Sequence, residues 1–233
     1  MSNLHDHRFP NETDEYRKAR NSLLTEEIAL RRQVEKVAAA RRALPVGGEL
    51  RENYRFTENY LDTAGQLQER QIEFADLFNP QHDNLLVYSF MYGPEMDTPC
   101  PSCSSILDSL NGAVPHISQR TSLVVVAKSP MQRIRNWAIQ RGWDKLRLLS
   151  SAGSSYNSDY LAEGSAGNQL PALNVFQKKA SGIFHFYNTE MLYTPWDEGQ
   201  GPRHVDALWP LWSALDLLPE GRGSDWHPAL RYD

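Results

Sequence analysis

Cysteine is the scarcest reactive residue in this sequence. The 233 residues include two cysteines, Cys100 and Cys103, and two residues separate them. In a reducing compartment, a pair this close is more often redox-active or metal-binding than a structural cross-link. The chemistry of the chain is therefore expected to centre on this motif.

Long apolar runs and an excess of positive charge are also missing. The longest apolar runs, Leu85–Met91 and Leu123–Ala127, are far below the roughly 20 residues that a membrane span needs. With a net charge of −5, no excess of positive charge points to nucleic acid as a partner. The polar start of the chain, Met1 to Glu15, has no signal-peptide apolar region. We therefore expect a cytoplasmic protein with neither membrane nor nucleic acid as a partner.

A long helical pattern opens the chain. From Glu12 to Leu44, apolar residues recur at every seventh position and charged residues fill the other faces. The spacing predicts one amphipathic helix with a narrow apolar seam, ended by Pro45 and Gly47-Gly48. The seam consists of Tyr16, Leu23, Leu30, Val37 and Leu44. We expect residues 1–48 to form a helical extension whose seam packs either on the protein's own body or against a second copy in a homodimer.

Residues 49–233 change to strands that alternate with helices. Asn84–Tyr92 and Ser122–Lys128 are nearly continuous apolar runs rich in β-forming residues, which predicts two buried strands. Shorter strands are predicted at Tyr54–Phe56, Lys145–Leu149, Ala172–Gln177 and Ile183–Tyr187, and helices at Ser104–Leu110, Pro130–Arg141 and Val205–Leu218. Pro210 either kinks or begins the last helix. This order predicts an α/β domain whose parallel strands are joined by crossovers.

Two stretches of this domain are expected to lack regular structure. Gln66 to Leu77 is predicted only as a short segment before a turn at Asn79-Pro80. Ser150–Gln169 is rich in Ser, Gly and Asn, which predicts a solvated loop that contains Tyr156 and Asn157.

The paired cysteines follow a buried strand and begin a helix. A helix N-terminus carries unpaired N–H groups and a partial positive charge, and both stabilise a thiolate. They lower the pKa of a cysteine from about 8.5 towards roughly 3.5–7.5. Pro101 suits the first helical position, and Ser102 completes the link between the cysteines. We expect Cys100 to be the attacking nucleophile and Cys103, one turn further on, the resolving thiol.

Two other residues are candidates to support this site. Pro171 directly precedes a predicted strand, where thioredoxin-like folds place a cis-proline beside the CxxC motif, although a trans-proline at a strand start is the ordinary case. His116 follows the predicted CxxC helix. It either stabilises the Cys100 thiolate or serves as a structural histidine.

A metal site is the main alternative use of the two cysteines. Structural zinc needs four ligands, and the sequence has no third cysteine and no closely spaced histidine pair downstream. We therefore expect neither a metal nor a cofactor.

Several ordered motifs between Tyr88 and Trp143 resemble those of a bacterial thioredoxin-like family of unknown function, often described as predicted dithiol–disulfide oxidoreductases. The matching pieces are Phe90-Met91, Cys100-Pro101-Ser102-Cys103-Ser104, Asp108, Gly112-Ala113-Val114-Pro115-His116, Val124-Val125-Val126, Ser129-Pro130 and Arg141-Gly142-Trp143. The resemblance continues through Ser150-Ser151, Tyr156-Asn157 and Val175-Phe176 to the segment from Asp216 to Arg222. It implies a thioredoxin-like fold, with a central mixed sheet flanked by helices and a long N-terminal helical extension.

The motif departs from ordinary thioredoxins in two ways. Pro99 precedes the first cysteine where thioredoxins have Trp, and the residues between the cysteines are Pro-Ser. Glu95 and Asp97 also lie close in sequence, and negative charge opposes a thiolate.

The leading hypothesis is a thiol–disulfide oxidoreductase whose substrate is a disulfide or thiol in a protein or a small molecule. One alternative is a binding or scaffold protein that kept the fold without the catalysis. A peroxiredoxin-like peroxide reductase is less favoured, because Asp97 stands where the Thr-x-x-Cys pattern needs threonine.

Overall fold

The computed structural model describes residues 4–232. Residues 1–3, the first positions of the polar N-terminal segment, and residue 233 lie outside the described part. The chain divides into two compact units, Met1–Pro45 and Val46–Asp233. Within the described residues, no helix combines the length and the apolar character that crossing a membrane requires.

The first unit is dominated by a single helix, α1 (Asp14–Arg42). Its start is fixed by Thr13, whose side chain accepts a hydrogen bond of 3.1 Å from the backbone N–H of Tyr16. Acidic residues in the first turn and arginines in the last complement the helix dipole. The predicted helix is thus confirmed. Leu23 and Leu30 of the seam are 52% and 64% exposed in the single chain, so pairing of this face with a second copy stays a prediction.

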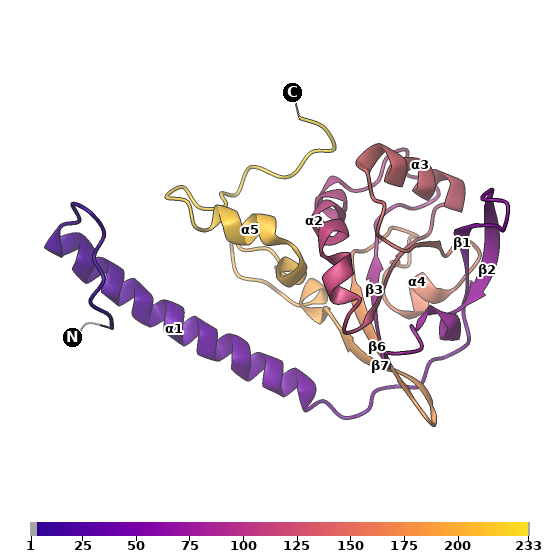
Figure 1. Cartoon of the computed structure of the whole chain (residues 1–233), viewed down its shortest axis with the longest axis horizontal. Helices are drawn as coiled ribbons and strands as arrows, with labels where there is room; N and C mark the ends of the chain where they lie inside the picture. The colour runs from indigo at the N-terminus through magenta and orange to yellow at the C-terminus, as the bar shows by residue number, and fades with distance from the viewer. Residues whose placement is uncertain (1–3, 233) are drawn as a thin grey trace. The chain divides into compact units, whose positions relative to one another are not determined.

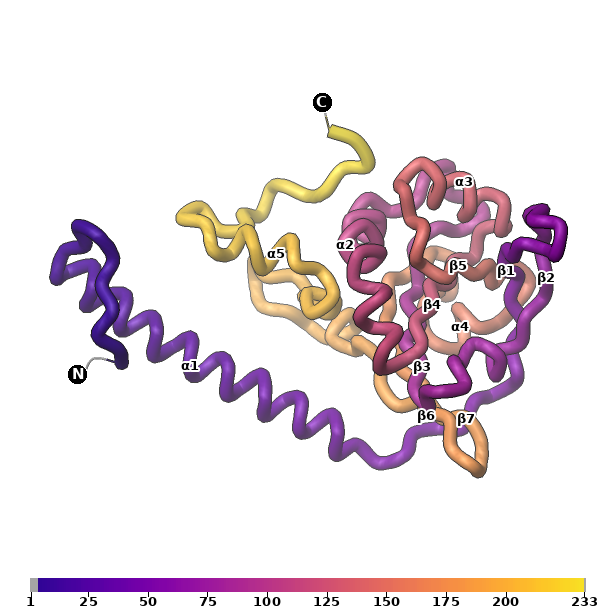
Figure 2. The backbone as a smooth tube through the Cα atoms, viewed as in Figure 1, coloured from indigo at the N-terminus to yellow at the C-terminus, as the bar shows by residue number. Residues whose placement is uncertain are grey.

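The second unit is built on one mixed sheet of seven strands in the order β2-β1-β5-β4-β3-β6-β7 (Figure 2). The strands are β1 (Arg55–Leu61), β2 (Leu67–Glu73), β3 (Asn84–Ser89), β4 (Ser122–Ala127), β5 (Leu148–Ser150), β6 (Leu173–Lys179) and β7 (Gly182–Asn188). The central strands β3, β4 and β5 are parallel, and β6 runs antiparallel to β3. The other neighbouring pairs are antiparallel as well.

The connections between these strands give a thioredoxin-like fold. The helices are α2 (Pro101–Ile117), α3 (Met131–Arg141), α4 (Tyr156–Asp159) and α5 (Pro210–Leu215), with short 3-10 turns η1 (Phe74–Leu77), η2 (Glu190–Tyr193) and η3 (Asp206–Leu208). Helix α2 joins the parallel strands β3 and β4, and the hairpin β6–β7 adds to the other side of β3 before α5 closes the chain. This order of strands, CxxC helix, hairpin and closing helix confirms the predicted fold class.

Side-chain alternation along the central strands creates two separate cores, on opposite faces of the sheet. In Figure 1, α2 and α4 lie on opposite sides of β3. One face, here called the dithiol face, packs α2, α3 and α5 against Tyr88 of β3 and Val125 of β4. The other, here called the aromatic face, packs η1 and α4 against Val87 and Val124, the neighbours of those two residues in the chain.

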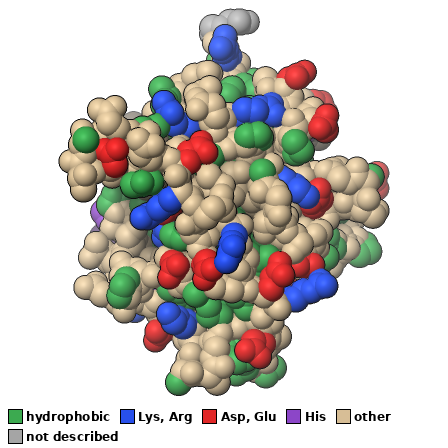
Figure 3. All heavy atoms as spheres, turned by 90° about the vertical axis from the view of Figure 1, so that its right-hand side faces the viewer, with side chains coloured by type: hydrophobic (Ala, Val, Ile, Leu, Met, Phe, Trp, Pro, Cys, Tyr) green, Lys and Arg blue, Asp and Glu red, His purple; other side chains and the backbone are tan. Residues whose placement is uncertain are grey.

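The structure corrects the prediction for residues 66–77. They form strand β2 and turn η1 rather than a short irregular segment. The strand was missed because its first five residues are exposed and polar side chains dominate it, so no apolar alternation marks it. Opposite charges pair across the hairpin instead, with Arg55 against Glu73 and Arg70 against Glu58. Figure 3 shows acidic and basic side chains interspersed on one face of the molecule.

The expected solvated loop is also corrected. Residues 150–169 contain α4, and its Tyr156 and Asn157 are almost completely buried. A hydrogen bond of 2.6 Å from Ser151 Oγ to Asn157 Oδ1 and one of 3.1 Å from Asn157 Nδ2 to Gln169 Oε1 satisfy the buried amide. The polar residues that predict a solvated loop therefore form hydrogen bonds with one another inside a buried segment.

Candidate functional site

The CxxC motif lies at the N-terminus of α2, on the dithiol face of the sheet. Cys100 is the N-cap residue and Pro101 occupies the first turn, where its missing N–H costs no hydrogen bond. The backbone N–H of Cys100 donates to the carbonyl of Met91 over 3.0 Å, and its own carbonyl accepts from the backbone N–H of Ser104 over 3.0 Å. The backbone of the motif is thus fixed from both sides.

The two thiols are free but differ in exposure. Cys100 is half-buried, whereas Cys103 is 1% exposed and belongs to the core of the dithiol face. Pro101 is exposed and Ser102 is half-buried. A partner in solution therefore reaches Cys100 first, and Cys103 is accessible mainly to the sulfur of Cys100.

The surroundings of the two sulfurs drive their pKa values apart. A hydrogen bond from the Cys103 thiol is the main cause that lowers the pKa of Cys100, to about 6, against the opposing effect of burial. The backbone N–H groups of Cys103 and Ser102 and the Ser102 hydroxyl act in the same direction. The pKa of Cys103 is raised, first by its bond to Cys100 and then by burial. At neutral pH this pattern favours a Cys100 thiolate beside a protonated Cys103.

Tyr88 is a part of the site that the sequence did not identify. It is fully buried on the dithiol face, in the same core as Cys103. Its hydroxyl has no hydrogen-bond partner of ordinary geometry, yet it lies close enough to Cys103 to lower the pKa of that thiol. The signal was present in the strand before the motif, because alternation places Tyr88 on the same face as Phe90, beside the CxxC helix.

The loop from β3 to the first cysteine is fixed by hydrogen bonds from α3 and from the segment just before it. Arg133 donates from Nη1 to the carbonyl of Pro94 over 2.7 Å and from Nη2 to that of Met96. Ser129 donates through its hydroxyl to the carbonyl of Gly93 over 2.9 Å. The acidic residues in this loop, Glu95 and Asp97, are exposed, and neither is among the main causes of the pKa shift of Cys100.

Pro171 lies next to the end of β3, the strand that leads into the CxxC loop, and it is not a cis-proline. The residue after it, Ala172, accepts a backbone hydrogen bond of 2.8 Å from Ser89 at the end of β3. No peptide bond among residues 4–232 is cis, so Pro171 is trans. Its carbonyl accepts a hydrogen bond of 2.9 Å from His204 Nε2.

His116 is not brought to the site. It is exposed in the last turn of α2, and Cys100 caps the other end of the same helix. A separation of 16 residues at 1.5 Å per residue places them about 24 Å apart. His116 therefore neither stabilises the Cys100 thiolate nor exchanges a proton with it.

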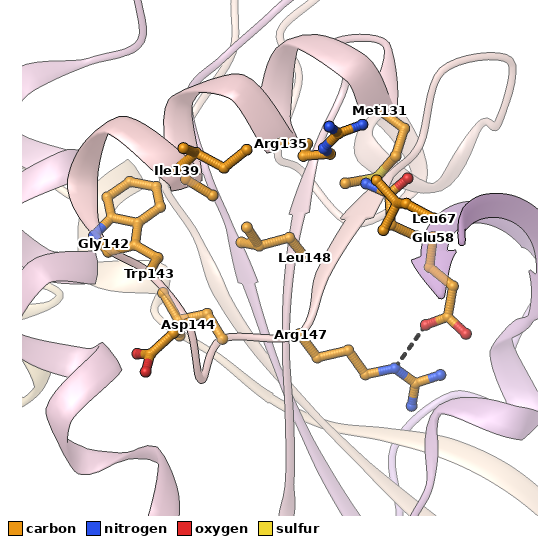
Figure 4. Close-up of a pocket in the computed structure, with 13 residues that line it drawn as sticks. Glu58, Leu67, Met131, Arg135, Ile139, Gly142, Trp143, Asp144, Arg147 and Leu148 are labelled. Atoms are coloured by element: carbon orange, nitrogen blue, oxygen red, sulfur yellow. Dashed lines mark hydrogen bonds and ion pairs between the residues drawn. The ribbon is translucent and has the colours of Figure 1, made fainter. Parts of the chain in front are cut away.

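One cavity is lined by no residue near the dithiol. It has a volume of about 550 Å³ and is lined by α3, β5 and the β1–β2 hairpin, with no residue of the CxxC motif. Figure 4 shows the ion pair between Arg147 and Glu58 at its edge, with an Nε–Oε2 distance of 2.9 Å. No cluster of three or more His, Cys, Asp or Glu side chains suited to a metal ion occurs among residues 4–232.

Comparison with known proteins gives one family and several distant structures. Residues 6–232 match a family described as bacterial protein of unknown function (DUF899). No curated protein matches the chain.

Among solved structures, the chain is similar to thioredoxin peroxidase I of Plasmodium yoelii, with 15% identity and a TM-score of 0.43 over 81% of this chain and 99% of that one. It is also similar to peroxidoxin BcpB of Mycobacterium tuberculosis, with 16% identity and a TM-score of 0.40 over 74% and 98%. The fold is assigned from the order and direction of the strands.

Proposed function

We propose that this chain, which belongs to DUF899, a family of bacterial proteins of unknown function, is a thiol–disulfide oxidoreductase. The reacting residues are Cys100 and Cys103. The observation that carries the proposal is the half-buried Cys100 at the start of α2, with its pKa lowered to about 6 beside a fully buried second thiol. Membership of the family agrees with the resemblance seen in the sequence but supplies no activity. We also propose the cytoplasm as its compartment, where thiol pools keep such a pair reduced.

The proposed reaction is a single two-electron exchange. The Cys100 thiolate attacks one sulfur of a substrate disulfide, forms a mixed disulfide and releases the other half as a thiolate, which takes a proton from water. Cys103 then attacks the Cys100 sulfur, and the second half departs as a thiolate that takes up the proton which Cys103 gives up. The substrate disulfide is reduced to two thiols, and the protein is oxidised to a Cys100–Cys103 disulfide.

Each residue near the sulfurs has a role in this sequence of steps. The N–H groups at the start of α2 and the Ser102 hydroxyl stabilise the attacking thiolate. Because Cys103 is buried, a second substrate disulfide does not reach its sulfur, which stays free to attack the mixed disulfide on Cys100. Tyr88 stabilises the Cys103 thiolate that forms in the second step.

The test is the pH dependence of alkylation of the reduced protein by iodoacetamide, with Cys100→Ser as the background. We expect a midpoint near pH 6, set by the pKa of Cys100. Cys103→Ser keeps a hydrogen-bond donor beside Cys100, whereas Cys103→Ala removes it, so only the alanine variant is expected to move the midpoint markedly upwards. A midpoint at or above about 8.5 in the unsubstituted protein contradicts the proposal and favours a scaffold protein.

A further inference from the structure

A second cavity opens directly beside the dithiol. Its volume is about 410 Å³, and Ser102, one of the two residues between the half-buried and the buried cysteine, forms part of its wall. The rest of the wall comes from residues 196–206, from the start of α5 and from residues 222–227. A space of this size is in the range of small-molecule sites, about 300–1,000 Å³.

Tryptophan dominates the wall of this cavity. Of the six tryptophans in the chain, four line it, namely Trp196, Trp209, Trp212 and Trp226. The ring centroids of Trp209 and Trp212 lie 5.1 Å apart, and those of Trp212 and Trp226 lie 6.0 Å apart. Trp209 and Trp212 are buried, whereas Trp196 and Trp226 are 58% and 44% exposed at the opening. The wall therefore offers flat ring faces from the depth of the cavity to its rim.

The aromatic wall is fastened to the helix that carries the cysteines. Trp209 donates a hydrogen bond of 3.0 Å from Nε1 to the hydroxyl of Ser105, in the first turns of α2. In Figure 2, α5 lies beside α2. His204 also lines the cavity and holds the Pro171 carbonyl over 2.9 Å. The cavity, the dithiol and the start of β6 are thus parts of one connected structure.

Two of the three charged side chains in the wall, Arg222 and Asp206, pair with each other, and the third is Arg203. Arg222 pairs with Asp206 over 3.0 Å and with Asp216 over 2.5 Å, and its guanidinium lies 5.4 Å from the centre of the Trp212 ring. Burial lowers the pKa of His204, which keeps its ring neutral. The Nδ1 atom of that ring is buried and has no hydrogen-bond partner. These features favour a ligand with a flat, weakly charged body over a strongly ionic one.

We propose that this cavity binds the body of the substrate, and that the substrate class is a low-molecular-weight disulfide that carries an aromatic ring. The ring lies against the tryptophans, and the disulfide extends past Ser102 to Cys100. The inference rests on the proposed exchange reaction, because it identifies what that reaction acts on. Cys100 forms a bond to the nearer substrate sulfur as the S–S bond of the substrate breaks, and the other half departs as a thiolate that takes a proton from water.

The experiment measures binding without chemistry. In the Cys100→Ser/Cys103→Ser double variant, which cannot react, isothermal titration calorimetry follows 2,2′-dithiodipyridine, with bis(2-hydroxyethyl) disulfide as the aliphatic comparison. We expect saturable binding of the aromatic disulfide alone, weakened about 2- to 10-fold by Trp226→Ala or Trp196→Ala. The control Leu217→Ala removes an apolar side chain that is 85% exposed and outside the cavity wall, and it is expected to leave binding unchanged.

The outcomes separate the inference from the function on which it rests. Equal binding of the two disulfides, or tryptophan variants that bind as tightly as the Leu217 control, overturns the assigned substrate class even when the pKa of Cys100 is near 6. A pKa of about 8.5 or more with selective aromatic binding overturns the exchange reaction and leaves a ligand site. In the protein with both cysteines, the reaction rate with each disulfide is first divided by the rate of free cysteine with the same disulfide. The resulting preference for the aromatic over the aliphatic disulfide is expected to fall in Trp226→Ala.

Discussion

The two faces of the sheet share their strands but use the buried residues differently. On the aromatic face, rings pack on rings, and the centroids of Phe74 and Phe176 lie 4.7 Å apart, those of Tyr160 and Phe176 4.9 Å. On the dithiol face, the core includes the Cys103 thiol and continues towards a cavity beside Ser102. The core of one face consists of packed apolar and aromatic side chains, and the core of the other also holds a reactive thiol.

Each face also buries one tyrosine whose hydroxyl lacks a partner of ordinary geometry. These are Tyr88 on the dithiol face and Tyr156 on the aromatic face, and both are fully buried. The difference lies in the groups that they approach, because Tyr88 lies by Cys103 and Tyr156 by the Asn174 amide. The same chemical group is therefore a structural residue on one face and part of the candidate site on the other.

The largest effect is expected on the aromatic face. Phe176→Ala removes a ring that contacts Phe74, Tyr160 and His185, and the loss of a buried ring costs about 3–5 kcal/mol of the free energy of unfolding. We expect the midpoint of Cys100 alkylation to stay near pH 6, because the ring is on the other side of the sheet. Urea unfolding and the alkylation profile measure the two quantities.

The milder Phe176→Leu variant serves as its control. It keeps most of the apolar volume, and we expect a clearly smaller loss of stability. If either folded variant moves the midpoint by a full pH unit, the two faces are not independent and the comparison fails.

The sequence predicted the fold through the strands that the two faces share. The runs at residues 84–92 and 122–128 are apolar on both sides, as strands buried on both faces must be. The hairpin β1–β2 gave no such signal, because charge pairs rather than apolar alternation hold β2. The burial of Tyr156 was missed for a related reason, since its Ser- and Gly-rich neighbours obscure a contact that forms only with distant strands.

Only the part of the candidate site that is contiguous in sequence could be predicted. The positions of Cys100, Pro101 and Cys103 at the start of a helix follow from adjacent residues. Trp209 and His204 reach the site from more than 100 residues away, and no spacing in the sequence connects them to the motif. His116 was the opposite case, because closeness in sequence suggested a contact that a rigid helix prevents.

A smaller effect is expected from the matched pair of tyrosine variants. Tyr88→Phe and Tyr156→Phe each remove one unpartnered hydroxyl, so both are expected to retain or slightly gain stability. Only Tyr88→Phe removes a group that lowers the pKa of Cys103, and the second step of the exchange is expected to slow by roughly tenfold. Stopped-flow measurement of release of the second thiol tests this difference, and equal rates in the two variants contradict the role of Tyr88.

The last prediction concerns the pH dependence of the stability of the reduced protein. The folded pKa of Cys100, about 6, is below the unfolded value of about 8.5, so in this interval the unfolded chain binds more protons and stability rises with pH. Cys103 has a raised folded pKa, so above about pH 8.5 the folded chain holds more protons and its contribution to stability falls. Subtracting the unfolding free energy of Cys100→Ser/Cys103→Ser at each pH isolates these two groups. The difference is expected to peak near pH 8.5, whereas a difference that decreases between pH 6 and 8 means that the dithiol face does not stabilise the Cys100 thiolate.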